Sequence, residues 1–403
     1  MKLSVIICIH NTNPHLLCEC LSSLSRAILP PIDCETILVD DGSDTDYSDI
    51  ARQYGAVYER REERGTLAAR IHGIGLARGE YIAFVDSDDT VGFNYYAPMV
   101  KRAEEGFDIV FNAWAFRTEG TRYFCVNDDS VSGEIVSDEP IRAFFYREGK
   151  QHSYYVLWNK IYRRTLLTEV AQKIEMECPP CPFCFSEDTL INLFAFSLAR
   201  RVGSVRSGYY YYRIHKGQTV NATSRERLKH QIDSMSYTLK KCSEVADGDA
   251  SLSAKVDAWR ALMARSHLSR AREGKYFDLI PYIAEKYGVS ERQAPMRSDG
   301  EVYEKVKLLP KNAVEIEDAL LSICNSRSVI RVRRPRRGGY AELLLRSLEL
   351  CGREIEYRRD YPSLPRERIS PLKRLIFNRH IRRLAARLFK KGSPIRAFLK
   401  RFI

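Results

Sequence analysis

Short apolar runs alternate with segments of helical periodicity in the first part of the chain. The apolar runs lie at residues 3–9, 36–40, 56–61 and 80–85, and each ends at polar or turn-forming residues. Between them, residues 14–29, 47–55 and 66–79 repeat apolar side chains at the spacing of one helix face. This alternation predicts an α/β fold, with a mostly parallel sheet flanked by helices on both faces.

The first of these helices has a clear start signal. Asn13 suits the N-cap position, and Pro14 suits the first turn because its missing amide hydrogen would have no partner there. Leu17 and Leu21 then fall on one apolar stripe. The helix is predicted to end near Pro30, since proline cannot continue a helix.

Acidic residues follow two of the predicted strands. They are Asp40, Asp41, Asp86, Asp88 and Asp89. The carboxyl ends of parallel strands share one edge of a sheet, where such sheets bind ligands, so we expect both groups at that edge. Aspartate is also a common turn residue, and this interpretation stays open for either group alone. Together the two groups predict a bound Mg²⁺ or Mn²⁺ whose shell is completed by phosphate oxygens and water.

A helix with acidic residues in its first turn is predicted near the middle of the chain. Ser186 is the expected N-cap, and the apolar stripe that follows consists of Leu190, Leu193, Phe194 and Leu198. Glu187 and Asp188 then lie in the first turn, where the helix N-terminus favours their ionised forms. Upstream, Asn159 and Lys160 either reach a bound ligand or lie solvated at the surface.

Three cysteines at regular spacing, Cys178, Cys181 and Cys184, precede this helix. Their spacing is that of zinc or iron–sulfur ligands. A structural zinc site needs four ligands, and no further Cys or His follows at a matching spacing. Because the prolines between them stiffen the segment, we favour a structural or acceptor-lining loop, with a metal site as the alternative.

Composition restricts the class of protein. The chain has 403 residues, of which 44% are apolar and 29% charged, which suits one large domain with smaller additions. The apolar run near the start is too short for a secretory signal or a membrane span, so we expect a cytoplasmic protein. Eleven scattered cysteines argue against a disulfide framework.

The net charge of +12 is concentrated in the C-terminal tail. From Arg366 onward there are 13 Lys and Arg against one acid; subtracting these from totals of 64 and 52 leaves 51 of each sign before it. Apolar residues recur among the basic ones at roughly helical spacing. We therefore expect residues 363–403 to dock on the anionic inner face of a membrane as an amphipathic helix. A solvated tail or a helix packed on the body are the alternatives.

The segments between these regions suggest a domain order. Residues 1–224 are expected to form the first domain, 225–298 a helical segment and 299–362 a small α/β unit. The run "RVRRPRRGG" within that unit has the composition of an RNA-binding segment. Because the body is neutral and offers no stacking platform, we expect no nucleic-acid partner.

The order of several short motifs resembles that of a known enzyme family. The motifs are "SVIICIHN", "ILVDDGSD", "AARIHGIGLARGEYIAFVDSDD", "WNKIYRRTLL", "SEDTLIN" and "YYYRIHKGQT". In this order they resemble the family-2 glycosyltransferases, and the resemblance covers about residues 3–220. It implies the A-type glycosyltransferase fold, a nucleoside diphosphate sugar as donor and, most often, inversion at the anomeric carbon.

The resemblance also implies roles for individual residues. Asp41 would contact the nucleotide base, and the other implied donor-binding residues are Cys8, Asn11, Arg70, Asp86, Lys160 and Arg213. Asp88, with Asp86 and His215, would hold the metal. Asp188, with Glu187, would supply the catalytic base. The chain departs from the family pattern at Cys8, His10 and Ile71, which affects the identity of the base and ribose more than the reaction.

The expected function is therefore metal-dependent, inverting sugar transfer from a nucleoside diphosphate donor, with UDP favoured. The acceptor would be a saccharide or a lipid-linked saccharide of bacterial surface polysaccharide synthesis. A non-catalytic glycan- or nucleotide-sugar-binding scaffold of the same fold is the first alternative. A nucleotidyltransferase is the second, although the segment "CIHNTNPH" lacks the Gly-rich, Lys-bearing loop that it would need.

Overall fold

The computed structural model describes most of the first three quarters of the chain. The described residues are 1–27, 32–92, 94–112, 114–119, 122–127, 135–136, 139–145, 152–178, 185–205, 208–213, 224–291, 329–333 and 354–358. The chain divides into two compact units, Met1–Ala313 and Val314–Ile403. In the second unit, β13 (Val329–Arg333) and β14 (Glu354–Arg358) pair in parallel. The predicted tail at 363–403 lies outside the described residues.

The described part of the first unit contains an eight-stranded sheet in the order β3-β2-β1-β4-β10-β6-β11-β9. Its strands are β1 (Leu3–Ile9), β2 (Cys34–Asp41), β3 (Val57–Arg61), β4 (Tyr81–Phe84), β6 (Ile109–Asn112), β9 (Ile135–Val136), β10 (Lys160–Arg163) and β11 (Arg201–Val205). The first four are mutually parallel, which confirms the expected sheet. β10 runs antiparallel to β4 and β6, so the sheet is mixed at its middle.

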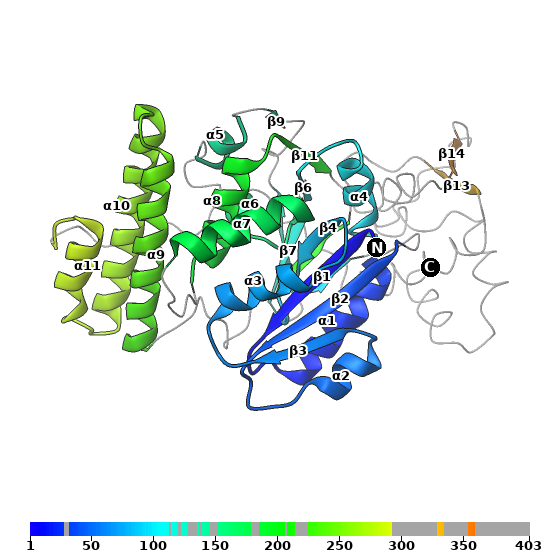
Figure 1. Cartoon of the computed structure of the whole chain (residues 1–403), viewed down its shortest axis with the longest axis horizontal. Coiled ribbons are helices and arrows are strands. Elements are labelled where there is room, and N and C mark those ends of the chain that lie inside the picture. Colours follow the sequence, from blue (N-terminus) through cyan, green and yellow to red (C-terminus); the bar gives the residue numbers. More distant parts are fainter. Residues whose placement is uncertain are drawn as a thin grey trace, which may run out of the picture. The chain divides into compact units, whose positions relative to one another are not determined.

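Helices cover both faces of this sheet (Figure 1). They are α1 (Pro14–Ala27), α2 (Ser48–Gln53), α3 (Thr66–Leu76), α4 (Ala97–Ala103), α7 (Arg164–Glu177) and α8 (Glu187–Leu198). Because side chains alternate along a strand, Ile6 of β1 packs in the cluster that contains α3, α7 and α8, whereas Val5 and Ile7 pack in the cluster with α1 and α4. Successive residues of β1 therefore contribute to the two apolar layers on opposite faces of the sheet.

Two local sequence features shape the helices on the main sheet, and the first of them was predicted. The Oδ1 of Asn13 accepts a hydrogen bond of 2.9 Å from the amide of His15, so the N-cap of α1 is confirmed. In α3, Gly73 allows close approach to the sheet, because a Cβ there would lie 2.6 Å from Cγ2 of Ile6. The helix thus sits tightly on β1, with Arg70 one turn before the contact.

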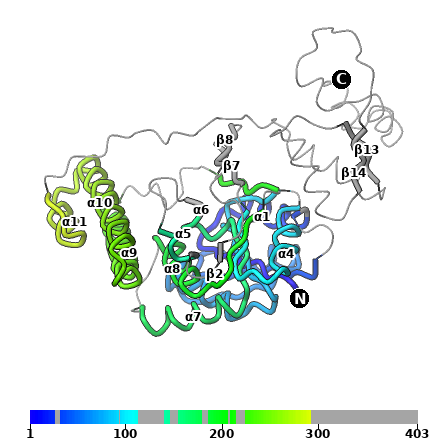
Figure 2. Tube along the Cα trace, turned by 90° about the horizontal axis from the view of Figure 1, so that it is seen from above, coloured from blue at the N-terminus to red at the C-terminus, as the bar shows by residue number. Residues whose placement is uncertain are grey.

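A smaller sheet, β5-β12-β7-β8, begins where the second acidic group ends. Its strands are β5 (Thr90–Val91), β12 (Tyr210–Arg213), β7 (Trp114–Glu119) and β8 (Arg122–Asn127). β7 and β8 form an antiparallel pair. Figure 2 shows the main sheet and its flanking helices from above. Since β12 pairs with β5, the smaller sheet connects the residues around 210 to the loop that carries Asp86–Asp89.

A helical region follows the main sheet. Short helices α5 (Glu139–Phe145) and α6 (His152–Tyr155) lead towards β10, and three longer helices follow β12: α9 (Arg225–Val245), α10 (Ala250–Glu273) and α11 (Leu279–Tyr287). The apolar faces of α9, α10 and α11 join the core cluster of α8. Within the described ranges, no helix is long and apolar enough to cross a membrane.

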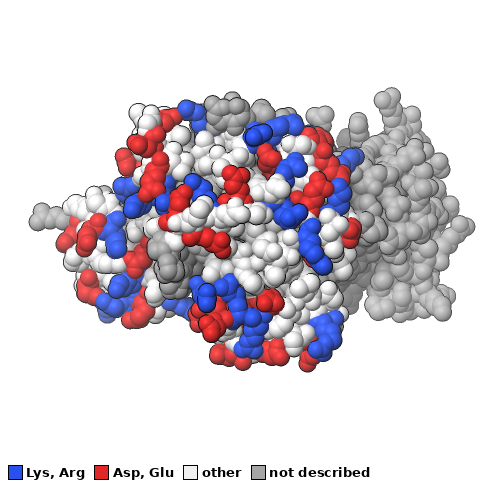
Figure 3. Space-filling view, in the orientation of Figure 1, with Lys and Arg blue, Asp and Glu red and all other residues white. Residues whose placement is uncertain are grey.

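The described surface carries charges of both signs. On the face shown in Figure 3, basic and acidic side chains are interspersed over the helices and the sheet edge. This distribution agrees with the equal numbers of basic and acidic residues before position 366. It leaves the charge asymmetry of the chain to its C-terminal tail.

Candidate active site

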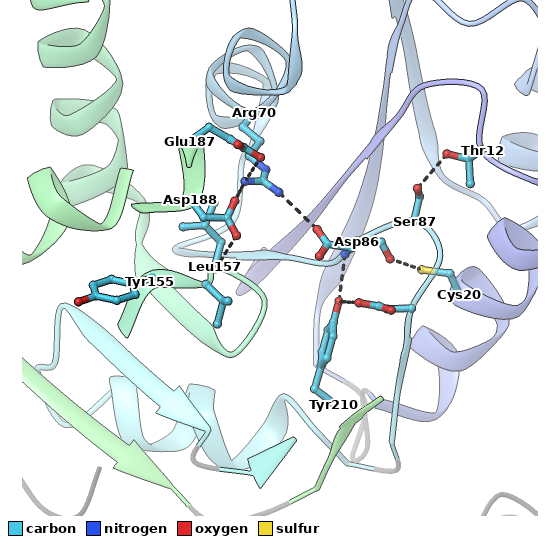
Figure 4. A network of polar contacts seen from close by, with 12 residues as sticks. Thr12, Cys20, Arg70, Asp86, Ser87, Tyr155, Leu157, Glu187, Asp188 and Tyr210 are labelled. Carbon is cyan, nitrogen blue, oxygen red and sulfur yellow. Dashed lines mark hydrogen bonds and ion pairs between the residues drawn. The ribbon is translucent and has the colours of Figure 1, made fainter. Parts of the chain in front are cut away.

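Arg70 is the centre of a cluster of charged side chains that come from three elements (Figure 4). It projects from α3, and its side chain is only 8% exposed. Its Nη2 lies 3.3 Å from Oδ1 of Asp86, just after β4, and its Nη1 lies 3.2 Å from Oε1 of Glu187 at the start of α8. The same Nη1 contacts Oδ1 of Asp188. One guanidinium thus joins the expected donor-binding and catalytic carboxylates.

The electrostatics of this cluster follow from its burial. Burial lowers the pKa of the Arg70 guanidinium, but Glu187 and Asp86 raise it by more, so the group stays charged. Burial raises the pKa of Asp86 to about 6, although the positive charge of Arg70 acts in the opposite direction. Because three acidic side chains share the single charge of Arg70, this charge does not offset the effect of burial on the pKa of Asp86.

The loop that carries Asp86 is held by a buried tyrosine and a buried aspartate. The amide of Asp86 donates to the hydroxyl of Tyr210 at 3.1 Å, and this hydroxyl donates to Oδ2 of Asp89 at 2.8 Å. The amide of Arg213 donates to Oδ1 of Asp89 at 2.7 Å. Burial raises the pKa of Asp89 well above its usual value. The ring of Tyr210 stacks on Trp158, with 4.3 Å between centroids.

The first acidic group, at the end of β2, shapes the loops around it. The two oxygens of Asp41 accept hydrogen bonds from the amides of Arg64, at 3.1 Å, and Gly65, at 2.8 Å. Asp40 is fully buried and accepts from the amide of Ser43 and the hydroxyl of Tyr58. Both carboxylates lie at the expected sheet edge, but the structure uses them to fix turns. A contact of Asp41 with a nucleotide base stays a prediction.

Two residues that we expect to bind the donor lie near the end of β1: Cys8 within the strand and Asn11 just after it. Asn11 has a φ of +49°, and its side-chain oxygen accepts a 2.8 Å hydrogen bond from the amide of Asp44, while its own amide donates to Ser43. It therefore links the loops after β1 and β2. The Cys8 thiol is uncharged, because burial raises its pKa. Neither role in donor binding is tested by these contacts.

Lys160 does not lie at the surface, so the solvated alternative for this residue is wrong. Its side chain is fully buried, and Nζ donates to Oδ1 of Asn159 at 2.8 Å and to the carbonyl of Val156. The ammonium also lies 4.6 Å from the ring centroid of Phe111. Lys160 closes the turn before β10, and its contact with a donor stays a prediction.

Arg213 ends β12, and its guanidinium reaches α1. Nη2 lies 2.7 Å from Oε2 of Glu19, in a partly exposed ion pair. A donor diphosphate would have to compete with this carboxylate, so the expected contact stays a prediction. His215, the other residue expected on the departing group and the metal, lies outside the described residues.

The acidic residues of α8 lie where the sequence predicts, and Ser186 holds the predicted N-cap position, but its side chain makes no capping hydrogen bond. Glu187 and Asp188 occupy the first turn. Ser186 adopts a left-handed conformation with a φ of +63°, and its hydroxyl pairs with Oγ1 of Thr238 on α9 at 2.9 Å. It therefore ties two helices together instead of capping α8. The amide of Leu157 points at Oδ2 of Asp188 from 3.4 Å.

The residues expected to bind a metal suit a site in which the protein supplies only one or two of the ligands. Among the described residues, no three Cys, His, Asp or Glu side chains are grouped as a metal cage. Asp86 and Asp88 follow β4, and the raised pKa of Asp86 indicates a carboxylate that another cation would stabilise. Two carboxylates with phosphate oxygens and water suit Mg²⁺ or Mn²⁺. Cys181 and Cys184 lie outside the described residues, so the cysteine alternatives stay open.

Sequence reasoning missed Tyr210 and Asn192. Tyr210 bonds to the amide of Asp86 and to the predicted Asp89, and so supports the Asp86 loop, while Asn192 donates to the carbonyl of Asp188. A signal existed for Asn192, because residues four apart share one face of a helix. The pairing of Tyr210 with Asp89 joins residues 121 positions apart, and local periodicity carries no trace of it.

Comparisons with known proteins find a family model and relatives that match part of this chain. Residues 4–181 match the model of "Glycosyl transferase family 2". EpsH of Bacillus subtilis strain 168 is 33% identical over 230 residues, which are 54% of this chain and 62% of EpsH. The glycosyltransferase GlyA of Streptococcus pneumoniae is 27% identical over 245 residues, which are 58% of this chain and 34% of GlyA. The chain thus matches less than two thirds of each relative's length.

A crystal structure of S. aureus TarS 1–349 in complex with UDP-GlcNAc is 18% identical, with a TM-score of 0.44, and the match covers 76% of this chain and 100% of that one. The family match and the mostly parallel, helix-flanked sheet confirm the A-type glycosyltransferase fold expected from the sequence. Residues 4–181, somewhat less than half of this chain, are therefore similar to glycosyl transferase family 2, and the relatives that match them are glycosyltransferases.

Proposed function

We propose that the protein transfers a sugar from a nucleoside diphosphate donor to a hydroxyl group of a saccharide acceptor. The convergence of Asp86 and Asp188 on Arg70 is the observation that carries this proposal. Sugar transfer needs a base near the acceptor hydroxyl and a site that stabilises the leaving diphosphate. Asp188, on α8, suits the first task, and Asp86, at the edge of the parallel strands, suits the second.

In this reaction the acceptor oxygen attacks the anomeric carbon while the bond to the diphosphate breaks. Asp188 takes the proton of the acceptor hydroxyl, with Glu187 as the second carboxylate beside it. Attack from the face opposite the leaving group inverts the anomeric centre. A divalent cation bound by Asp86 and Asp88 would neutralise charge on the departing diphosphate. Arg70 stays charged and holds the two halves of the site together through its contacts with Asp86 and Asp188.

Release of a nucleoside diphosphate tests the reaction directly. The purified protein is incubated with UDP-glucose, UDP-galactose or UDP-N-acetylglucosamine and Mn²⁺, with water or a soluble saccharide as acceptor. We expect release in at least one case, and a loss of about 10²- to 10⁴-fold in kcat for Asp188→Asn with donor affinity retained. Glu175→Gln, an exposed acid on α7, is the matched control. Donor binding without any release would favour the non-catalytic scaffold.

The metal is tested by binding as well as by turnover. Titration calorimetry with UDP should show tighter binding in the presence of Mn²⁺ than in EDTA, and Asp88→Asn should abolish this difference without lowering the melting temperature. Equal UDP binding with Mn²⁺ and with EDTA would contradict the proposed role of Asp88.

A lipid-linked acceptor of surface polysaccharide synthesis, with the basic tail docked on an anionic membrane, completes the proposal. The tail lies outside the described residues, so the support for docking comes from the sequence. It is the concentration of positive charge after position 365, which anionic lipid headgroups attract. A chain truncated after Leu364 should lose cosedimentation with phosphatidylglycerol vesicles while it still turns over a soluble acceptor. Equal sedimentation of the full and truncated chains would rule out docking by the tail.

A further inference from the structure

A fully buried amide on α8 lies beneath the proposed base. Asn192 is completely inaccessible to solvent, and its Nδ2 donates hydrogen bonds to the carbonyls of Tyr155, at 2.8 Å, and Asp188, at 2.9 Å, with Val156 at 3.3 Å. Its Oδ1 accepts a 2.7 Å hydrogen bond from the hydroxyl of Tyr162 on β10. Both ends of the amide are therefore used, and its orientation is set by its partners.

These bonds connect the start of α8 to the segment that crosses in front of it. The carbonyls of Tyr155 and Val156 belong to the peptide groups just before Leu157, whose amide points at Oδ2 of Asp188. Figure 4 shows Tyr155, Leu157 and Asp188 along this crossing. Asn192 bonds to both carbonyls, and Lys160 also bonds to that of Val156, so the two side chains fix the peptide group that carries the Leu157 amide.

The Asp188 carboxylate has contacts on two sides. On one side Oδ1 meets the guanidinium of Arg70, which also holds Glu187 and Asp86. On the other side Oδ2 accepts a hydrogen bond from the backbone amide of Leu157. The Arg70 contact alone would leave the carboxylate free to rotate about its Cβ–Cγ bond. The hydrogen bond from the Leu157 amide restricts this rotation, and the peptide group that carries this amide is bonded to Asn192 and to Lys160.

We propose that Asn192 is a positioning residue that orients Asp188 for the reaction through the segment 155–157. The inference rests on the proposed function, in which Asp188 is the base. A misplacement of about 1 Å in a reacting group can lower a rate on the order of a hundredfold, so a residue that touches no substrate can still control kcat.

The test combines Asn192→Leu with a matched control. Gln231 on α9 is also a buried amide, which accepts a 2.6 Å hydrogen bond from Arg270, so Gln231→Leu removes a comparable group outside the site. Hydrogen exchange of the free proteins is followed by mass spectrometry. We expect Asn192→Leu to lose protection in the peptide that contains residues 155–157, and Gln231→Leu to keep it.

Kinetics separate positioning from stability. With the UDP-sugars of the release assay, Asn192→Leu should lower kcat by about tenfold or more with the donor KM within about twofold, whereas Gln231→Leu should leave both unchanged at a temperature where each variant is folded. Tyr162→Phe removes the hydroxyl that orients the amide and should give a smaller loss of kcat.

The outcomes distinguish this proposal from the proposed function. Unchanged protection of 155–157 in Asn192→Leu overturns the positioning role, as does a loss of kcat no larger than that of Gln231→Leu. A wild-type protein that binds UDP-sugars but releases no UDP would instead overturn the proposed function, and hydrogen exchange would still report whether Asn192 holds the segment.

Discussion

Two regions of the molecule bury an ionisable side chain, and they treat it in opposite ways. At the sheet edge, Arg70 is almost inaccessible but keeps its charge, because carboxylates surround it. In the helical region, His267 of α10 is 1% exposed, and its ring nitrogen Nδ1 pairs with the hydroxyl of Tyr287 at 2.8 Å. Burial and, to a lesser extent, the charge of nearby Arg270 together lower the pKa of His267 to about 3.

The two regions differ in whether a buried ionisable group is charged. Nε2 of His267 has no hydrogen-bond partner in the described part of the chain, and the ring of Phe185 lies beside the imidazole. That region gains stability by keeping the ring neutral. The sheet edge retains Arg70 with three acidic groups. Burying them costs desolvation energy, but the attraction between the guanidinium and the carboxylates is stronger at low dielectric. Such a cluster is a candidate for chemistry, whereas the histidine is a structural group.

The largest effect is expected from removing the cation. Arg70→Met should lower the free energy of unfolding by about 3 kcal/mol or more and abolish sugar transfer, because three partly buried carboxylates lose their shared partner. Chemical denaturation at pH 7.5 measures the loss. The deficit should shrink as the pH falls, since protonated carboxyl groups repel one another less.

An exposed arginine supplies the control for this variant. Arg52 on α2 pairs with Asp49 at the surface, so Arg52→Met should change stability by less than about 0.5 kcal/mol and leave transfer intact. Arg70→Lys keeps the charge but loses the fork that reaches several carboxylates, and we expect it to recover stability better than activity. Full activity of Arg70→Met would show that the cluster is structural.

The second effect concerns the neutral histidine. Its folded pKa, about 3, lies below the unfolded value of 6.5, so below pH 6.5 the unfolded chain binds a proton that the folded chain does not. Stability therefore falls with pH below about 6.5 and is unaffected by this group above it. Between pH 7.5 and 5.5 the loss should be about 1.4 kcal/mol.

Removal of the ring tests this assignment. His267→Gln keeps a group that can bond to Tyr287 but does not titrate, so its stability should vary less between pH 7.5 and 5.5 than that of the wild type, by about 1.4 kcal/mol. His230, which is exposed on α9, is the matched control, and His230→Gln should retain the wild-type slope. An unchanged slope in His267→Gln would mean that other groups cause the acid sensitivity.

The smallest effect lies where the two regions meet. Thr238 of α9 pairs with Ser186 just before the acidic turn of α8, so Thr238→Val should lower the free energy of unfolding by about 1 kcal/mol. Ser236→Ala, which removes a hydroxyl bonded only within α9, is expected to be nearly neutral. If Thr238→Val is also neutral, the hydroxyl of Ser186 does not hold the two regions together.

The sequence by itself determined the local structure around the site. Periodicity located β1, α1, α3 and α8, and the Asn13 cap is present as predicted. It also placed acidic residues after β4 and in the first turn of α8, because strand ends and helix starts are readable over a few positions. The same local signal located Ser186 at the N-cap position but not the partner of its hydroxyl, which pairs with Thr238 on α9 instead of capping α8.

Only the tertiary structure decided which of these groups meet. Arg70 contacts one carboxylate sixteen positions away and two on α8, and Asn192 joins α8 to β10 and to the segment before it. Lys160, which sequence alone left between a ligand contact and the surface, is in the core. Periodicity reports which face of an element is buried, but not what lies opposite that face. Partners of buried polar groups are chosen by packing across the whole fold, because each such group must find a hydrogen bond or a counter-charge there.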